Sequence, residues 1–158
     1  MSGLFNFGRQ VAKPFKMKKL LMFNQLQVYN VVADVQQYKH FVPHCTNSVV
    51  LRTGIPQIEV ELTVQFLMFK ESYISVVSMF PPERIVAKSS GTKLFKHLHS
   101  TWIISTHTAT SCWVEITIDY QFQSSLYEAA SRQYLTSSAQ NTISAFETRC
   151  SQLYKKQP

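Results

Sequence analysis

Apolar and polar residues alternate along two long stretches of the chain. From Gln57 onward every second residue is apolar, and glutamate, threonine or glutamine lies between: Ile58, Val60, Leu62, Val64 and Phe66. This period of two predicts a strand with one buried and one wet face, as in an antiparallel sheet. The pattern returns in the last predicted strand, which we expect to be the longest, with an inward face of even-numbered residues: Cys112, Val114, Ile116, Ile118, Tyr120 and Phe122.

Shorter runs rich in β-branched and aromatic residues predict the remaining strands. They cover residues 16–23, 46–53, 69–80, 84–89 and 97–105. Two short helical segments are predicted after the first strand. Asn24 is a suitable N-cap for one, and Asp34 starts the other. Pro43 then prevents helix continuation, so residues 38–45 are predicted to form a turn.

The last part of the chain, residues 125–156, contains neither glycine nor proline. Its apolar or small residues, whose later steps are four, three, four and three, predict one helical stripe: Leu126, Ala130, Tyr134, Ala139, Ile143, Phe146, Cys150 and Leu153. Ser124 or Ser125 is expected to cap this helix. At ~1.5 Å per residue it is roughly 45 Å long. The whole order predicts an α+β fold in which a curved antiparallel sheet grips the helix.

Charge is distributed unevenly along the 158 residues, which carry 16 basic and 9 acidic side chains. Five basic residues precede the first acid, Asp34, and aromatic and aliphatic residues lie among them: Arg9, Lys13, Lys16, Lys18 and Lys19. We therefore predict a basic segment at 1–15, for targeting or membrane contact, before one domain at 16–156. A nucleic-acid arm and a tail without a role are the alternatives. No apolar run approaches the ~20 residues of a membrane span, so we expect a soluble or peripheral protein.

The residue types offer little for catalysis or metal binding. The three cysteines are odd in number and form no CxxC pair, which argues against a disulfide framework or a zinc ribbon. His97 and His99 share a strand face, and His40 and His44 lie near Cys45, but neither set has zinc-site spacing. No nucleophile elbow or phosphate-binding glycine loop is present. We predict no catalytic residue and no metal site.

Four segments together resemble one known family. They are VYNVVADVQQYKHFVPHC, SGTKLFKHLHSTWII, ITIDYQFQSSLY and AFETRCSQLY, at 28–45, 90–104, 116–127 and 145–154. Their order and separation resemble the mitochondrial coenzyme-Q-binding family of the START-like, helix-grip superfamily, over nearly the whole domain. The resemblance implies a non-enzymatic carrier or chaperone for a polyprenyl quinone, needed for quinone synthesis and respiratory electron transport. It also implies a peripheral location on the matrix side of the mitochondrial inner membrane.

The same resemblance implies coenzyme Q as bound ligand, with no other cofactor and no nucleic-acid partner. Quinone-synthesis enzymes or respiratory complexes are the further partners it suggests. The predicted ligand-binding residues are Tyr38, Phe41, Leu62, Val64, Phe66, Tyr73, Ser100, Trp102, Ile104, Ile118, Tyr120, Ala139, Ile143 and Phe146. Because one neutral hydrogen bond nets only ~1 kcal/mol, the tail is expected to supply affinity and a few donors orientation. The donor candidates are Tyr38, Tyr73, Ser75, Ser100 and Trp102.

One departure from the family pattern concerns the turn after Pro43. The family often carries an aromatic residue there, and this chain has His44, which is more polar and titrates near neutral pH. The superfamily also contains polyketide cyclases and bacterial ribosome-association factors, and fold alone does not give function. A cyclase-like enzyme and a ribosome- or RNA-associated module therefore remain alternatives. A His paired with Asp or Glu on the inner face would favour the enzyme.

Overall fold

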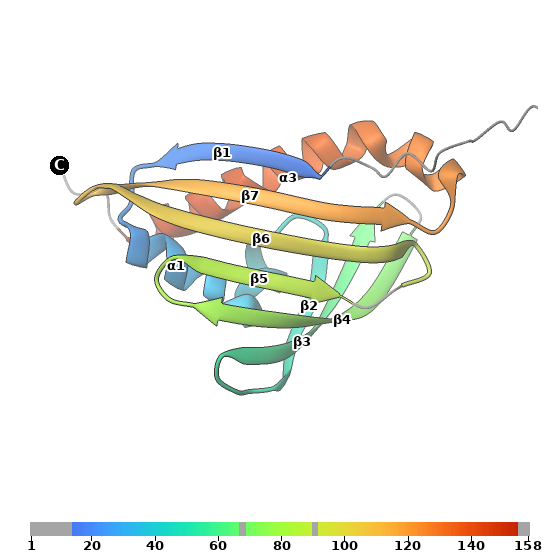
Figure 1. Cartoon of the computed structure of the whole chain (residues 1–158), viewed down its shortest axis with the longest axis horizontal. Coiled ribbons are helices and arrows are strands. Elements are labelled where there is room, and N and C mark those ends of the chain that lie inside the picture. Colours follow the sequence, from blue (N-terminus) through green and yellow to red (C-terminus); the bar gives the residue numbers. More distant parts are fainter. Residues whose placement is uncertain (1–13, 67–68, 90–91, 155–158) are drawn as a thin grey trace, which may run out of the picture.

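A computed structural model describes residues 14–66, 69–89 and 92–154, without the side chains of 66 and 129–135. One sheet, two short helices, a 3₁₀ turn and a long terminal helix make up this part of the chain (Figure 1). The strands are β1 (Phe15–Leu21), β2 (Cys45–Arg52), β3 (Gln57–Phe66), β4 (Phe69–Phe80), β5 (Arg84–Ser89), β6 (Phe95–Thr108) and β7 (Ser111–Phe122). The helices are α1 (Gln25–Ala33), η1 (Val35–Gln37), α2 (Tyr38–Phe41) and α3 (Ser125–Leu153).

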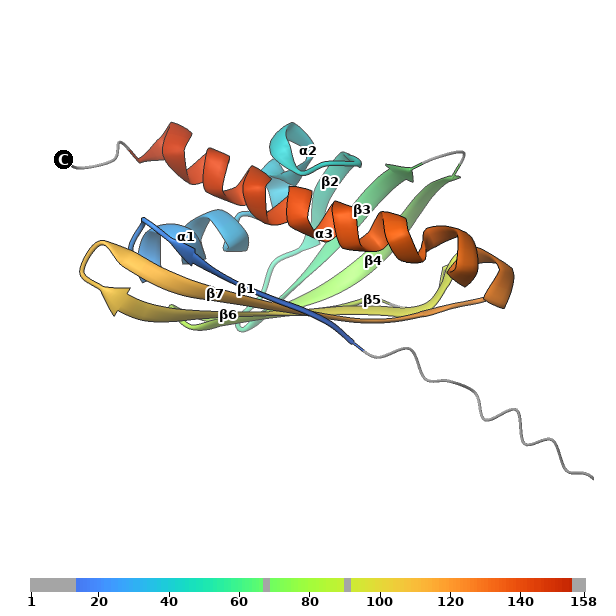
Figure 2. The same cartoon turned by 90° about the horizontal axis from the view of Figure 1, so that it is seen from above.

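The sheet has the strand order β1-β7-β6-β5-β4-β3-β2, and every neighbouring pair is antiparallel. Strands that follow one another in sequence lie side by side, except that β1 pairs with β7. Figure 2 shows that the sheet curves and that α3 crosses its concave side together with α1 and α2. The predicted α+β architecture, with a curved sheet around a long C-terminal helix and two short helices after the first strand, is confirmed.

Among the described side chains, the predicted faces of the strands are confirmed with one exception. In β7 the residues at 112, 114, 116 and 122 are buried. Thr63 of β3 was predicted to face water and is only 6% exposed, and its hydroxyl bonds that of Ser72 at 2.8 Å. The prediction that β7 is the longest strand was wrong. β6 has 14 residues and β7 has 12, since β6 continues beyond the predicted 97–105 at both ends.

Side-chain caps fix where the helices begin. Asn24 accepts a hydrogen bond from the Gln27 backbone N–H at 2.9 Å, and the Gln27 side chain accepts from the Asn24 backbone N–H at 3.0 Å. This reciprocal capping box satisfies two donors that the first turn of α1 leaves without partners. Ser124 caps α3 by accepting from the Leu126 backbone N–H at 3.2 Å. The sequence had left Ser124 and Ser125 open as caps, and Ser124 is the one used.

The terminal helix buries the part of its predicted stripe from Ala139 to Cys150, and the side chains of Ala130 and Tyr134 lie outside the described part of the chain. Ala139, Ile143, Phe146 and Cys150 are at most 9% exposed. Leu126 and Leu153 were predicted to belong to the same stripe, but they are 80% and 52% exposed. A helix of 29 residues is about 43 Å long. Its ends pack through other residues: the Tyr127 ring lies 5.3 Å from that of Phe69, and Tyr154 packs against the main core.

The predicted basic segment at 1–15 lies almost entirely outside the described residues, as do residues 155 and 156 of the predicted domain. β1 begins at Phe15, next to the predicted domain start. Among the residues that the structure describes, no helix is both long and apolar enough to cross a membrane.

Candidate functional site: a cavity between the sheet and the terminal helix

A cavity of about 290 Å³ lies between the concave face of the sheet and α3. Its wall is almost entirely apolar, and it is drawn from all seven strands, the α1–β2 connection and the terminal helix. Most of the predicted ligand-binding residues line it: Tyr38, Leu62, Val64, Tyr73, Ser100, Trp102, Ile118, Ala139, Ile143 and Phe146. The structure thus brings together residues from β3, β4, β6, β7 and α3 that lie far apart in sequence.

Three predicted residues have other positions, and the side chain of a fourth is not described. Phe41 packs behind the wall, with its ring 5.1 Å from that of Phe146. Ile104 is 1% exposed in the core, and Tyr120 belongs to a second apolar cluster near the start of α3. The side chain of Phe66 lies outside the description. None of the first three lines the cavity, and contact of any of the fourteen with a ligand stays a prediction.

One end of the cavity is closed by aromatic rings around Phe146. Trp102 lies 4.7 Å from the Phe146 ring, and Tyr38 lies 5.3 Å from it, both edge to face. Beyond this cluster comes solid core, since Ile104 follows Trp102 on the same face of β6 and accepts a hydrogen bond from the Gln25 side chain of α1 at 2.7 Å. α1 therefore fills the space under the end of the sheet. The cavity begins where that filling ends.

A few polar side chains face the cavity, and they differ in whether another protein group already forms a hydrogen bond with them. The Tyr38 hydroxyl donates to the Val32 carbonyl oxygen, so it is not available as a ligand donor. Tyr73, Ser75, Ser100 and Trp102 also line the cavity, and within the described part of the chain their side chains make no hydrogen bond. Ser75 and Trp102 are nevertheless only 2% and 8% exposed. Neither Ser75 Oγ nor Trp102 Nε1 is among the fully buried, unpartnered polar atoms of the described residues, which are Tyr29 Oη and Arg149 Nε, so both donors are accessible from the cavity.

Burial keeps the acidic groups of the wall in their neutral forms. Desolvation raises the pKa of Tyr73, and nearby Cys45 and Glu71 raise it further. Desolvation also raises the pKa of Tyr38, with additional contributions from Asp34 and Cys45. The pKa of Cys45 is raised by burial, although a backbone hydrogen bond with Asn47 and the charge of Lys39 act in the opposite direction. These groups are hydrogen-bond donors at neutral pH and carry no charge.

The turn between α2 and β2 contributes Pro43 and His44 to the wall, and the first residue of β2 contributes Cys45; the sequence did not predict them as ligand-binding residues. His44 has a φ of 66°, a left-handed conformation that histidine adopts more readily than most residues. Its carbonyl accepts from the Gln65 backbone N–H at 2.8 Å, and its Nδ1 lies 3.1 Å from the Gln65 carbonyl oxygen. These contacts fasten the turn to the end of β3. The departure at His44 was the one sequence signal that pointed here.

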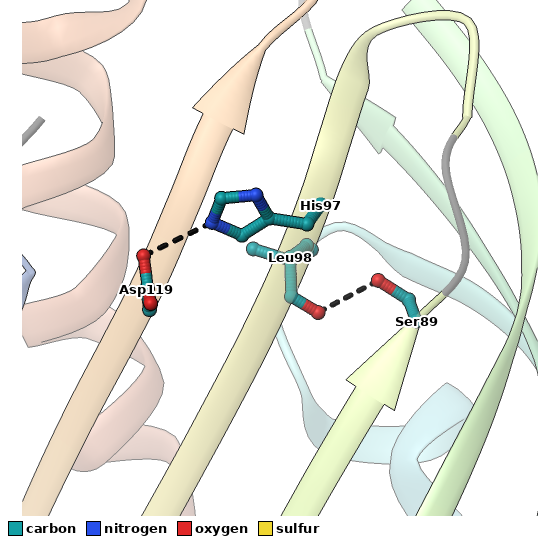
Figure 3. A network of polar contacts seen from close by, with 4 residues as sticks. All are labelled: Ser89, His97, Leu98 and Asp119. Atoms are coloured by element: carbon teal, nitrogen blue, oxygen red, sulfur yellow. Dashed lines mark hydrogen bonds and ion pairs between the residues drawn. The ribbon is translucent and has the colours of Figure 1, made fainter. Parts of the chain in front are cut away.

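A histidine–carboxylate pair does occur, but on the other side of the sheet. His97 Nε2 lies 3.0 Å from Asp119 Oδ1 (Figure 3). Leu98, the next residue of β6, lines the cavity, so the side chain of His97 points away from it. The pair is also well hydrated, with side chains 32% and 50% exposed. Among the described residues, no group of three or more His, Cys, Asp and Glu side chains could hold a metal ion.

The profile of the polyketide cyclase/dehydrase and lipid-transport family matches residues 25–147. Among curated proteins, the mitochondrial coenzyme Q-binding protein COQ10 of Dictyostelium discoideum is 33% identical over 88% of this chain and 69% of its own. The mitochondrial coenzyme Q-binding protein COQ10 homolog B of Xenopus laevis is 32% identical over 88% of this chain. The chain belongs to the START-like family of coenzyme Q-binding proteins. It spans 58% of the Xenopus relative's length.

Other members of the fold are more distant. The ribosome association toxin RatA of Vibrio cholerae is 25% identical over 85% of this chain and 93% of its own. Among solved structures, the Zhui aromatase/cyclase of Streptomyces sp. R1128 superposes with a TM-score of 0.82 at 15% identity, over 88% of this chain and 93% of that one. A START superfamily protein of Mycobacterium smegmatis gives 0.78 at 17%, over 89% and 98%. These structural likenesses support the fold and say nothing about the ligand.

Proposed function

We propose that this protein binds a polyprenyl quinone of the coenzyme Q type in its cavity and acts as a non-enzymatic carrier or chaperone for it. The observation that carries the proposal is the wall itself: hydrocarbon and aromatic side chains, with a few neutral donors that have no hydrogen-bond partner among the described residues. A quinone has an apolar body and oxygens that only accept hydrogen bonds, so it complements such a wall. The curated relatives named for coenzyme Q binding support the same ligand.

Affinity and orientation come from different parts of such a ligand. At ~0.8 kcal/mol per buried CH₂-sized group, each five-carbon unit contributes roughly 3 to 4 kcal/mol before ordering costs. A hydrogen bond to a ring oxygen nets only about 1 kcal/mol. Leu62, Val64, Ile118 and Ile143 then provide the contacts that hold the ligand. The donors decide how the ring lies.

The neutral state of the tyrosine and cysteine side chains in the wall supports binding and transport of a ligand rather than catalysis. A nucleophilic cysteine needs a lowered pKa, and burial raises the pKa of Cys45 instead. Tyr38 and Tyr73 are likewise held in their neutral forms. The His97–Asp119 pair, which would serve an enzyme as base and orienting group, lies on the opposite face. The cavity therefore favours holding a ligand unchanged over a cyclase-like reaction.

The place of action that we propose is the matrix side of the mitochondrial inner membrane, with the protein bound peripherally. The relatives' names, which include the word mitochondrial, support the compartment. The basic segment at 1–15 would contact anionic lipid, and the domain at 16–156 would hold the quinone. Delivery would go to quinone-synthesis enzymes or respiratory complexes, with no nucleic acid involved.

The test is to purify the full chain from cells that make polyprenyl quinone, extract it with organic solvent and identify the lipids by mass spectrometry. We expect quinone at a fixed ratio to protein, reduced in the Leu62→Ala variant. Quinone no more abundant than in an extract of an unrelated protein prepared in parallel would refute the proposal. If ribosomal material rather than lipid co-purified with the protein and was removed by a salt wash, the result would favour the ribosome-associated alternative.

A further inference from the structure

The free hydroxyls of the cavity floor are arranged around its smallest side chain. Ala87 of β5 lines the cavity and pairs directly with Ser100 of β6. Ser75 of β4 lies on the other side of β5, paired with Ser89, two residues along from Ala87. Ser75 and Ser100 therefore lie diagonally on either side of Ala87. They are two strand spacings apart across the sheet and two residues apart along the strands. A methyl group between two hydroxyls leaves an open recess.

The Ser89 hydroxyl does not share in this arrangement, although Ser89 faces the same side. It donates to the Leu98 carbonyl oxygen at 2.6 Å (Figure 3), and Ser89 does not line the cavity. The hydroxyls of Ser75 and Ser100 make no hydrogen bond to any described residue. Ser75 is only 2% exposed as a residue, but its hydroxyl oxygen is not among the fully buried, unpartnered atoms of the described residues, so this oxygen is accessible from the cavity. On the cavity floor the hydroxyls of Ser75 and Ser100 therefore have no acceptor among the described residues, whereas the hydroxyl of Ser89 has one.

Their separation can be compared with a ligand. Two strand spacings of ~4.8 Å and two residues at ~3.3 Å place the Cα atoms of Ser75 and Ser100 roughly 12 Å apart. Figure 2 shows that the sheet curves around the side where α3 lies. Side chains on the concave face of a curved sheet converge, which brings the two hydroxyls closer together than the Cα atoms. A para-quinone carries its carbonyl oxygens on opposite sides of the ring, roughly 5 Å apart given C=O bonds of ~1.23 Å. Adding two hydrogen bonds of ~2.8 Å gives about 11 Å between the donor oxygens.

We propose that Ser75 and Ser100 bind the two para carbonyl oxygens of a quinone ring that lies over Ala87. This inference rests on the proposed function and specifies the position and orientation of the ring. Trp102, two residues after Ser100 on the same face, presents its ring to the same space. An ortho-quinone, with both oxygens on one side, cannot reach both serines. The arrangement therefore selects for the para-dicarbonyl ring.

The experiment measures binding of a ubiquinone with two isoprene units to the full chain and to Ser75→Ala, Ser100→Ala and Ser89→Ala. Each of the first two substitutions should weaken binding about five-fold, the factor that one neutral hydrogen bond contributes. Ser89→Ala is the matched control and should bind within about two-fold of the parent, because its hydroxyl is already used. Ala87→Leu fills the recess and should abolish ring binding, while a polyprenol of the same tail still binds.

Infrared spectra of the quinone with ¹³C in one carbonyl at a time give a readout that a merely structural role would not move. Both carbonyl bands should shift to lower frequency on binding to the parent. Ser75→Ala should release one band, and Ser100→Ala should release the other. Binding by the parent with bands that neither variant changes would overturn the placement and leave the proposed function intact. Absence of quinone binding by the parent would overturn both.

Discussion

Lys19 and Glu147 join the edge of the sheet to the terminal helix, with Lys19 Nζ 2.6 Å from Glu147 Oε2. Lys19 lies on β1 opposite Val114, on the face that carries the core, and Glu147 follows the buried Phe146 on α3. The pair therefore sits at the border of the core where the C-terminal half of α3 meets β1. Its side chains are 42% and 35% exposed, so water weakens the attraction between them.

The first prediction concerns this ion pair. A double-mutant cycle of Lys19→Gln and Glu147→Gln should give a coupling free energy of about 0.2–1 kcal/mol in urea unfolding, because exposed pairs are screened. The coupling should fall as salt is raised. A coupling that is larger and independent of salt would mean that the pair is shielded from solvent, contrary to its exposure.

The second prediction separates cavity wall from solid core. Leu62→Ala should lower the amount of quinone bound per folded molecule and lower stability only modestly, because half-buried Leu62 already borders empty space. Its control is Ile104→Ala, which removes a side chain 1% exposed and away from the cavity. That change should cost about 2–5 kcal/mol of unfolding free energy without changing quinone per folded molecule. Equal effects of the two variants on ligand occupancy would contradict this division.

The third prediction uses the two tryptophans, which lie on opposite faces of the sheet. Trp102 lines the cavity, whereas Trp113 lies under Lys18, whose Nζ is 5.2 Å from the ring centre. Quinone binding should quench the fluorescence of Trp113→Phe, which retains Trp102, and should leave Trp102→Phe nearly unchanged. Titration with a short-tailed quinone measures both. Strong quenching in Trp102→Phe would place the ligand on the other face.

The fourth prediction concerns His99, on the outer face of β6. Its pKa is lowered below 6.5 by desolvation first and then by the charges of His97 and Lys88, while Asp119 acts in the opposite direction. The folded protein thus binds a proton at His99 less readily than the unfolded chain does. This contribution to stability is fully present above the unfolded pKa of 6.5 and is lost as the pH falls toward the folded pKa.

His99→Gln should therefore make the unfolding free energy less dependent on pH below about 6.5. Urea unfolding of parent and variant at several pH values checks this. A steeper loss of stability in the variant on acidification would show that the sign is wrong. Trp113→Phe, which alters the same outer face without a titrating group, is the control.

The sequence predicted the floor of the cavity better than its extent. Periods of two in β3 and β7 correctly placed Leu62 and Ile118 on the inner face, since alternation follows directly from strand geometry. Alternation does not reveal where along a strand the cavity stops. Ile104 and Trp102 share a face of β6, yet α1 covers only the first of them. The end of the cavity along β6 depends on how α1 packs on the sheet, which cannot be predicted from the alternation of apolar and polar residues within one strand.

Residues in turns were harder to predict than those in strands. Pro43, His44 and Cys45 have no periodicity, and their place in the wall follows from the pairing of Cys45 with Val64 in the β2–β3 register. Tyr38 was predicted as a donor from its residue type alone. Its hydroxyl is used by the Val32 carbonyl instead, a contact between η1/α2 and α1 that depends on the tertiary arrangement. Residue type shows what a side chain can do, and the fold determines whether it is available.

The size of the cavity determines whether quinones with different numbers of isoprene units bind to the protein in the same way. Pockets that enclose whole drug-sized molecules run from ~300 to 1,000 Å³, and this one, at about 290 Å³, is at the lower limit. Under the proposed function it surrounds the ring and the nearest part of the chain, and the remaining units stay outside. Quinones that differ only in those outer units make identical contacts within the cavity. One and the same protein would then serve organisms whose quinones differ in the number of isoprene units, without any substitution in its wall.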